Sequence, residues 1–528
     1  MPNTPQFRFN VKNNNLEVST PGIGITHVLA RTTKGAFNDP SRIINSYPQF
    51  QRYFGEEIVP DGSVSNIRKA LENGSRLRIS RVEGSAAVDA AESIIPINFL
   101  DSAEDPIMTA VLKVKCISGL VGDILPDTSD PDVLVIKIGE ASVTFNLSSF
   151  YTTRYTTRDL LTDLINQTFN YQDENFIITV ANIEAGLSES VLVEGVSYPE
   201  YEVITTGTDG GTNVSVAKYV KAFKAFGQYK EAYQVMPSHI HQYTFASQTE
   251  NYLAVYKAIA DKLKGAYNSV LYVEVPKSFT TAATIAAQAK TMLETIGYSG
   301  TVAIFAGGLK YRNEYGISTD CDVLGTVVAL GDVSASLYGP QYSFAGLNRG
   351  VVPDALGVVM DPLGDNEDDL ADLQTLAEAH VNLFTIQDTP TNGRSVVLWH
   401  NFTANASSSS ERFLSTVRML IYLKKNIQPI FRSYIEEPNY WITWTRIKNQ
   451  CMPVFDPLIG NAIDGVPVWN GDQDVSSFDD LTVNTEAEVR QGKYKVEVHM
   501  RDLVTLQDIT LTVNMDQAAK SVSITTQA

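Results

Sequence analysis

The chain has 528 residues and a mass of 58.0 kDa, which predicts about two to four domains rather than one core. Its 41 basic and 60 acidic residues give a net charge of −19, which disfavours binding to nucleic acid or to anionic membranes. Three distant cysteines, no membrane-length apolar window and no apolar signal-peptide core lead us to expect a soluble protein made in a reducing cytoplasm.

The first 95 residues divide into a polar arm and the start of a folded domain. Residues 1–22 are rich in Asn, and their one alternating run holds Leu16 and Val18. We expect this arm to pack with the C-terminal domain or with a neighbouring subunit, since it cannot build a core of its own. A strand, two helices and a second strand at 77–82 are predicted next, and we assign 23–95 to a middle α/β domain.

Residues 96–206 have a different character. Short β-branched runs are separated by Gly, Pro, Asp and Ser, and the segment 157–169 is the one good helix. This pattern predicts a β-rich outer domain inserted into the middle domain.

From residue 207 the pattern changes to helices that alternate with apolar strands. The strands are expected at 232–237, 269–276 and 301–305, which indicates a largely parallel sheet. Weak periodicity in 307–355 predicts loops and short elements. We assign 207–355 to the middle domain.

The last third predicts a C-terminal core domain over 356–515. A long helix is expected over 409–435, because Ser408 and Glu411 form a capping box ahead of an apolar stripe at helical spacing. A second helix is predicted over 441–455.

The end of the chain alternates apolar and polar residues, as strands do, and we assign 516–528 to an exchanged strand. The fold class is therefore α/β (α+β) and multidomain, with mixed sheets and helices, a β-rich inserted domain and extended terminal strands. The alternating apolar residues at this end are Ile509, Leu511, Val513, Val522 and Ile524.

The search for catalytic chemistry is negative. The chain has no Walker loop, no Gly-x-Ser-x-Gly elbow and no His-Glu-x-x-His motif. His239 and His241 could share a metal on one face of a strand, but no third ligand is suggested nearby in the sequence. We therefore assign no catalytic, cofactor or metal residues, and no cofactor. Because a fold can bring distant carboxylates together, an α/β enzyme with an unrecognised site stays open as an alternative.

Several stretches resemble, in order, the contractile phage tail sheath proteins. Residues 21–56 (PGIGITHVLARTTKGAFNDPSRIINSYPQFQRYFGE) resemble the N-terminal region of that family, and 70–82 (ALENGSRLRISRV) its next strand element, with Ser75 in place of a glycine. Residues 206–223 (TGTDGGTNVSVAKYVKAF) are similar to its Gly-x-Asp-Gly turn before a helix, and the last third is similar over its whole length. The inserted domain carries none of these motifs.

This resemblance implies a structural subunit that forms hexameric rings stacked in a helical sheath around a tail tube, and whose contraction drives the tube through a bacterial envelope. The implied partners are further copies of the chain, the tail tube protein, and baseplate and tail terminator proteins, with no direct nucleic acid contact and no membrane insertion. The implied location is the virion tail, after assembly in the host cytoplasm. A sheath of a phage-like injection system or of a bacteriocin is the alternative within the family.

Two features of the residues agree with this role. The last strand lacks the charges that protect sheet edges, which suits strand exchange between subunits, with a frayed tail as the alternative. Residues 412–435 hold five basic residues and no acidic one, which suits contact with an acidic tube, with a solvated helix face as the alternative. The expected inter-subunit residues are Leu16, Val18, Ile509, Leu511, Val513, Val522 and Ile524. The expected tube-facing residues are Arg418, Lys425, Arg432, Arg446 and Lys448.

Overall fold

The computed structural model of the chain describes a central α/β unit, an inserted β-rich unit and C-terminal elements that include a helical arm. No helix in these parts is long and apolar enough to cross a lipid bilayer. The described residues are 25–85, 93–116, 123–127, 133–138, 141–150, 154–155, 158–172, 176–185, 191–193, 195–197, 204–205, 213–229, 231–247, 249–264, 268–313, 316–359, 370–389, 393–405, 410–455, 485–491, 494, 510–514 and 523–527.

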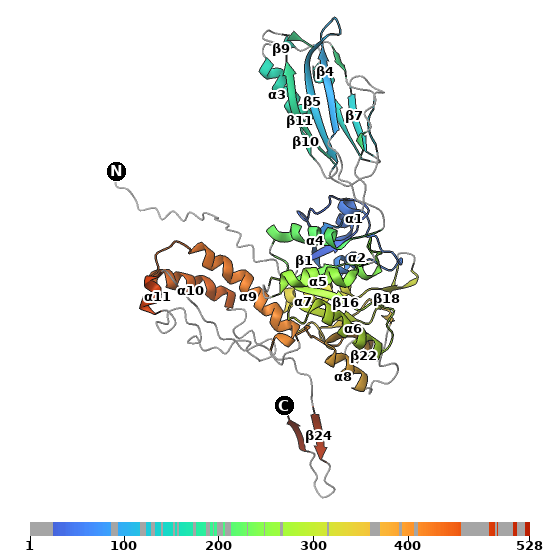
Figure 1. Cartoon of the computed structure of the whole chain (residues 1–528), viewed down its shortest axis with the longest axis vertical. Coiled ribbons are helices and arrows are strands. Elements are labelled where there is room, and N and C mark those ends of the chain that lie inside the picture. The colour runs from blue at the N-terminus through green and yellow to red at the C-terminus, as the bar shows by residue number, and fades with distance from the viewer. Residues whose placement is uncertain are drawn as a thin grey trace, which may run out of the picture.

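A nine-stranded mixed sheet forms the centre of the molecule (Figure 1). Strands β3, β1, β15, β16, β17 and β22 run parallel to one another, as the sequence pattern predicts, and antiparallel strands complete both edges. The spatial order is β2 (Ile43–Ile44), β3 (Arg76–Arg81), β1 (Ile25–Ala30), β15 (Gln234–Pro237), β16 (Val270–Glu274), β17 (Val302–Ala306), β22 (Val381–Thr389), β23 (Gly393–Leu398) and β20 (Val351–Val352).

Helices cover both faces of this sheet, because its strands are apolar on both sides. In β16, Tyr272 points into one core, and Leu271 and Val273 point into the core on the opposite face. The first core also takes up α1 (Tyr47–Phe54), α2 (Asn66–Glu72) and α7 (Leu324–Leu337). The second core takes up α4 (Val216–Lys224), its extension η2 (Ala225–Gln228), α5 (Tyr252–Leu263), α6 (Ala282–Ile296) and α8 (Leu370–Glu378).

Helix α7 corrects the expectation of loops and short elements in 307–355. Ten of its fourteen residues are buried, so it has no polar face to produce a helical pattern in the sequence. A small sheet precedes and follows this helix, in the order β19 (Ser318–Cys321), β18 (Leu309–Arg312) and β21 (Gly357–Val358).

The main sheet continues past residue 356, where the sequence analysis divides the middle domain from the C-terminal domain. β22 pairs with β17 on one side and with β23 on the other. The segment 381–398 thus belongs to the same sheet as the strands before 356.

The inserted unit pairs its strands among themselves and has its own core, which includes Phe99, Phe150 and Phe169. It stands at one end of the molecule in Figure 1, and the backbone N–H of Ser85 donates to the Asn213 carbonyl, 2.8 Å away, where the chain leaves and returns. Its helix α3 (Arg158–Phe169) confirms the predicted one. The five-stranded sheet has the order β10 (Tyr171–Gln172), β11 (Phe176–Ala185), β5 (Pro106–Cys116), β4 (Ser93–Leu100) and β13 (Gly195–Ser197). The four-stranded sheet has the order β14 (Ile204–Thr205), β6 (Asp123–Asp127), β7 (Val133–Ile138) and β8 (Ala141–Asn146). A separate pair is formed by β9 (Arg154–Tyr155) and β12 (Val191–Leu192). A short 3₁₀ turn, η1 (Ser148–Phe150), follows β8.

Candidate assembly surfaces

Two antiparallel helices, α9 (Leu414–Ser433) and α10 (Trp441–Phe455), form an arm that projects from the central unit (Figure 1). The first half of α9 belongs to the central core through Leu414, Val417 and Ile421. Further along, α9 packs on α10 through a small apolar cluster of Met419, Leu423, Ile447, Cys451 and Phe455. α10 confirms the helix predicted at 441–455.

Helix α9 begins later than predicted. A short 3₁₀ turn, η4 (Ser410–Arg412), precedes it, and Phe413 occupies the N-cap position without a side-chain cap. Glu411 lies in η4, where its carboxylate accepts from Asn405 Nδ2 at 3.3 Å, and Ser408 lies outside the described residues. The start at 409 was therefore wrong, because residues 410–412 adopt the tighter turn.

The structure places Arg418 inside the protein, although the sequence analysis expects its head in water or on a partner. Arg418 is only 2% exposed, and its Nη2 donates to the backbone oxygen of Gly331 in α7 at 2.6 Å. The guanidinium also lies 4.9 Å from the ring centroid of Phe344. The prediction was wrong because this flank of α9 packs on α7 rather than facing solvent.

Lys425 lies one heptad further along the same flank and also points back to the central unit. Its ammonium donates to the backbone oxygen of Ala232 and lies 5.1 Å from the ring centroid of Tyr233. Burial lowers the pKa of Lys425 to about 7. Its expected exposure was wrong because this turn of α9 packs on Ala232 and Tyr233, just before β15.

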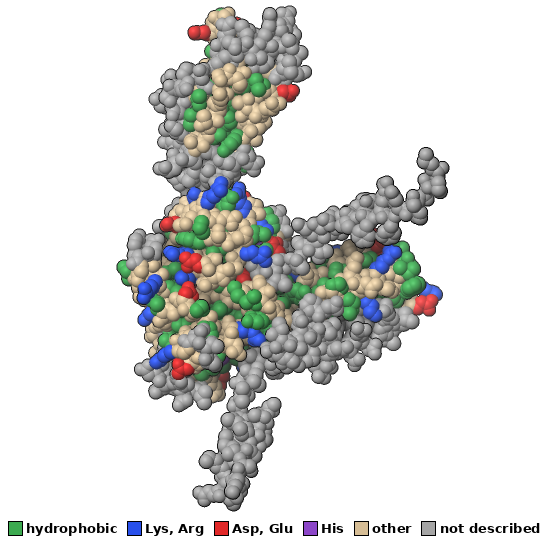
Figure 2. All heavy atoms as spheres, turned by 180° about the vertical axis from the view of Figure 1, so that it is seen from behind, with side chains coloured by type: hydrophobic (Ala, Val, Ile, Leu, Met, Phe, Trp, Pro, Cys, Tyr) green, Lys and Arg blue, Asp and Glu red, His purple; other side chains and the backbone are tan. Residues whose placement is uncertain are grey.

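The remaining tube-facing candidates lie further out on the arm. Arg432 and Arg446 are exposed, and Lys448 is half-buried. Figure 2 shows Lys and Arg side chains beside apolar ones on this arm. Their contact with a tube stays a prediction, now without Arg418 and Lys425.

The tip of the arm exposes large apolar side chains. Ile435 is 66% exposed and Trp441 is 67% exposed, while Tyr440 between them is 40% exposed. Below the tip, Trp444 is buried and donates through Nε1 to Asn439 Oδ1 at 2.7 Å, and a short helix, α11 (Glu486–Arg490), completes the arm. Exposed apolar side chains grouped in this way mark a contact surface more often than isolated ones do.

The C-terminal residues form a separate hairpin. β24 (Thr510–Asn514) pairs with β25 (Ser523–Gln527) in antiparallel register, with Val513 opposite Ile524 and Leu511 opposite Thr526. Within the described residues this sheet contains no third strand. A two-stranded hairpin is at best marginally stable alone, so its free edges are suited to further pairing.

Leu16, Val18, Ile509 and Val522 lie outside the described residues.

Buried titratable residues gather at the carboxyl ends of β15 and β16, where the sequence analysis found no metal set. His239 Nδ1 lies 2.7 Å from Asp322 Oδ2, and His241 Nε2 lies 3.5 Å from the same oxygen. Glu274, the last residue of β16, lies beside them. A signal for Glu274 was available, because it is the one charged residue in a strand of otherwise apolar residues.

Comparison with known proteins found similarity to solved structures alone. No protein-family model and no curated protein matches the chain. The solved structures that resemble its fold include sheath proteins. The helical sheath of the anti-feeding prophage in its contracted state is 13% identical, with 94% of each chain covered and a TM-score of 0.48.

Two bacterial sheath tail proteins are similar to the chain at comparable levels. The protein from Listeria innocua is 11% identical, with 82% of this chain and 84% of that chain covered and a TM-score of 0.46. The protein from Desulfitobacterium hafniense is 13% identical, with 87% and 88% covered and a TM-score of 0.43.

Proposed function

We propose that this chain is the structural subunit of a contractile sheath, which polymerises helically around a tail tube and contracts to drive the tube through a bacterial envelope. The observation that carries the proposal is the order of sheath-like motifs on one fold. Residues 21–56 run through β1 to α1, residues 70–82 run through the end of α2 to β3, and residues 206–223 lead into α4. Residues 436–444 (EEPNYWITW), within the last third that resembles the family, form the tip of the arm and the start of α10.

Strand exchange through the C-terminal hairpin would connect the subunits. Among the described residues no third strand pairs with β24 or β25, and the hairpin stands apart from the central unit in Figure 1. A strand from a neighbouring copy would complete this sheet through main-chain hydrogen bonds. The same contact repeated from each copy to the next is heterologous and generates an open helix, as a sheath requires.

Contact with the tube would come from the outer part of the arm. Arg432 and Arg446 are exposed in a chain whose net charge is −19, so they offer cationic side chains on the arm. Each exposed ion pair contributes only about 0–1 kcal/mol, so tube binding would depend on repetition around a ring.

Electron microscopy of the purified chain tests the proposal. The full chain should form tubes, whereas a chain that lacks residues 518–528 should stay folded and soluble without forming long tubes. Deletion of residues 1–19 should act in the same way if the N-terminal arm supplies the acceptor. Normal tubes from both truncated chains would contradict strand exchange, and a monodisperse monomer with ligand-dependent melting would favour an enzyme instead.

Co-assembly with tube protein tests the cationic side chains on the arm. Arg432→Glu with Arg446→Glu should weaken docking at low salt, and high salt should weaken docking of the unmodified chain, because screening acts on the same charges. Lys257→Glu is the matched control, since Lys257 is an exposed cation on α5, outside the arm. Docking that ignores both the arm substitutions and salt would assign these residues to solvent or to another sheath subunit.

A further inference from the structure

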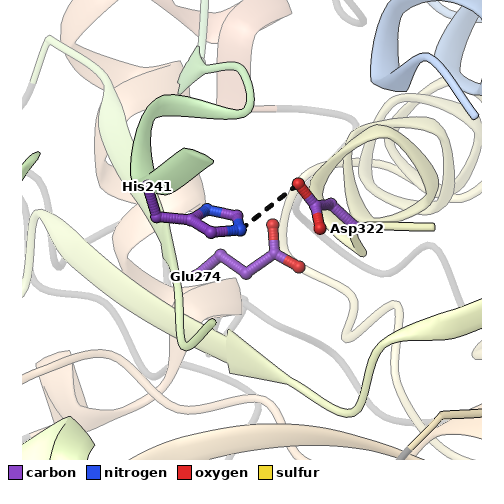
Figure 3. A group of neighbouring side chains, drawn as sticks. All are labelled: His241, Glu274 and Asp322. Atoms are coloured by element: carbon purple, nitrogen blue, oxygen red, sulfur yellow. Dashed lines mark ion pairs between the residues drawn. The ribbon is translucent and has the colours of Figure 1, made fainter. Parts of the chain in front are cut away.

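Three ligand-type side chains from distant parts of the sequence converge in the interior of the central unit (Figure 3). His241 lies in η3 (Ile240–Gln242), just after β15, Glu274 ends β16, and Asp322 follows β19. β15 and β16 are parallel neighbours, so their carboxyl ends meet at the same edge of the sheet. In open α/β sheets, ligands bind outside this edge.

The three side chains offer atoms that no other described group satisfies. Glu274 and Asp322 are 1% and 0% exposed. Glu274 Oε2, Asp322 Oδ1 and His241 Nε2 are buried and have no hydrogen-bond partner. An unsatisfied buried carboxylate oxygen costs more than a neutral group does, so three such atoms side by side need a common explanation.

We propose that His241, Glu274 and Asp322 bind a divalent transition-metal cation of the Zn²⁺ or Mn²⁺ type. One imidazole nitrogen with two carboxylate oxygens is a donor set that suits these ions. One ligand atom from each residue lies within 4.8 Å of the other two, and a point equidistant from three atoms at that spacing lies about 2.8 Å from each. Shifts of less than about 1 Å therefore reach zinc–ligand distances of 2.0–2.2 Å.

The other oxygens of the two carboxylates are already held in place. Glu274 Oε1 accepts from the backbone N–H of Val323 at 2.7 Å. Asp322 Oδ2 accepts from Gln242 Nε2 at 2.9 Å and lies 2.7 Å from His239 Nδ1. Such partners orient metal-ligating carboxylates, and here they leave Glu274 Oε2 and Asp322 Oδ1 without a hydrogen-bond partner.

A shared proton is the alternative explanation. Burial, together with the nearby charge of Asp322, raises the pKa of Glu274 well above its ordinary value, so Glu274 could be protonated when no cation is present. A proton would satisfy one carboxylate oxygen but would leave the second without a partner, and His241 Nε2 would keep only its 3.5 Å contact with Asp322 Oδ2. A cation would satisfy all three atoms, which is why the geometry favours it.

The bound ion would be structural. It would connect three elements that are distant in the sequence: the segment after β15, the end of β16 and the residue after β19, which leads into α7. This inference does not depend on assembly into a sheath, since every ligand belongs to the core of one chain.

Metal titration of the full-length chain tests the site. After EDTA treatment and dialysis near neutral pH, ZnCl₂ or MnCl₂ should bind at one ion per chain by equilibrium dialysis with elemental analysis. The same ion should raise the melting temperature, because it binds the folded state, and EDTA should reverse the rise. Glu274→Gln and His241→Gln should each weaken binding by about tenfold or more, the lower end of losses seen even for outer-shell partners.

Asp320→Asn is the matched control, because Asp320 is an exposed carboxylate on β19, two residues before Asp322. It should leave binding unchanged. Two results would overturn the proposal: absence of stoichiometric binding of either ion, or binding that Glu274→Gln and His241→Gln leave intact. If Glu274→Gln fails to fold, His241→Gln decides alone, since His241 lies at the edge of the cluster and is less buried than the two carboxylates.

Discussion

Reversal of the charge of Arg418 should destabilise the fold rather than merely weaken a contact with a partner. In Arg418→Glu a carboxylate would replace a guanidinium that is 2% exposed and donates to the Gly331 carbonyl. The new carboxylate would also lie near buried Asp332, on which the Arg418 charge now acts favourably. A second buried acid would then lie near Asp332 in place of the favourable charge of Arg418.

The expected loss can be worked out from these contacts. A hydrogen bond from a charged donor contributes about 1.5–3 kcal/mol, and removal of one partner from a buried charge arrangement costs about 3–5 kcal/mol. These contributions overlap, so we expect Arg418→Glu to lower the free energy of unfolding by about 3–5 kcal/mol. Arg432→Glu, on the exposed outer turn of the same helix, should change it by no more than about 0.5 kcal/mol.

Urea titration followed by tryptophan fluorescence measures the difference, because Trp444 is buried where α10 packs near α9. Adding Asp332→Asn to Arg418→Glu should recover part of the loss, since it removes the second buried acid. Equal unfolding midpoints for Arg418→Glu and Arg432→Glu would refute the buried placement of Arg418.

Three further predictions follow from other parts of the structure. Burial raises the pKa of Asp332 from 3.8 to about 7, so its contribution to the free energy of unfolding is complete below about pH 4 and is lost as the pH rises to about 7. In urea titrations at low and neutral pH, Asp332→Asn should reduce this fall in the free energy of unfolding. An unchanged fall would contradict the pKa shift. Trp441→Ser should shorten or abolish tubes without changing the melting temperature, because Trp441 is 67% exposed, whereas Tyr298→Ser, exposed on the central unit, should leave tubes intact. Limited proteolysis of tubes should cut within 96–206 before it cuts within 409–460, because an inserted unit that pairs its strands among themselves would touch few neighbouring subunits, and the reverse order would place the arm outside.

Elements with a strong pattern of their own could be predicted from the sequence. The helix at 441–455, the insert helix and the parallel sheet follow from residue periodicity and from the alternation of helices with apolar strands. Helix α7 could not be predicted, because a helix buried on nearly all sides lacks the alternation of apolar and polar residues that identifies a helix in a sequence.

The site residues were harder to predict because tertiary contacts decide them. The spacing of Arg418 and Lys425 places both on one flank of α9, but it does not say whether that flank meets solvent or α7. The convergence of His241, Glu274 and Asp322 depends on the order of strands in the sheet, and no local spacing encodes that order.

The hydrogen bond between Ser85 and Asn213 has a consequence for how the chain folds. β1 pairs with β15, so Thr26 and Gln234 must come together although the whole inserted unit separates them in the sequence. During synthesis, β1 can pair with β15 only after the insert has been made. If the insert stayed unfolded, closing so long a loop would cost conformational entropy and slow the pairing. Because the insert has its own core and its two ends are joined by a backbone hydrogen bond, its early folding replaces this long loop with a short one.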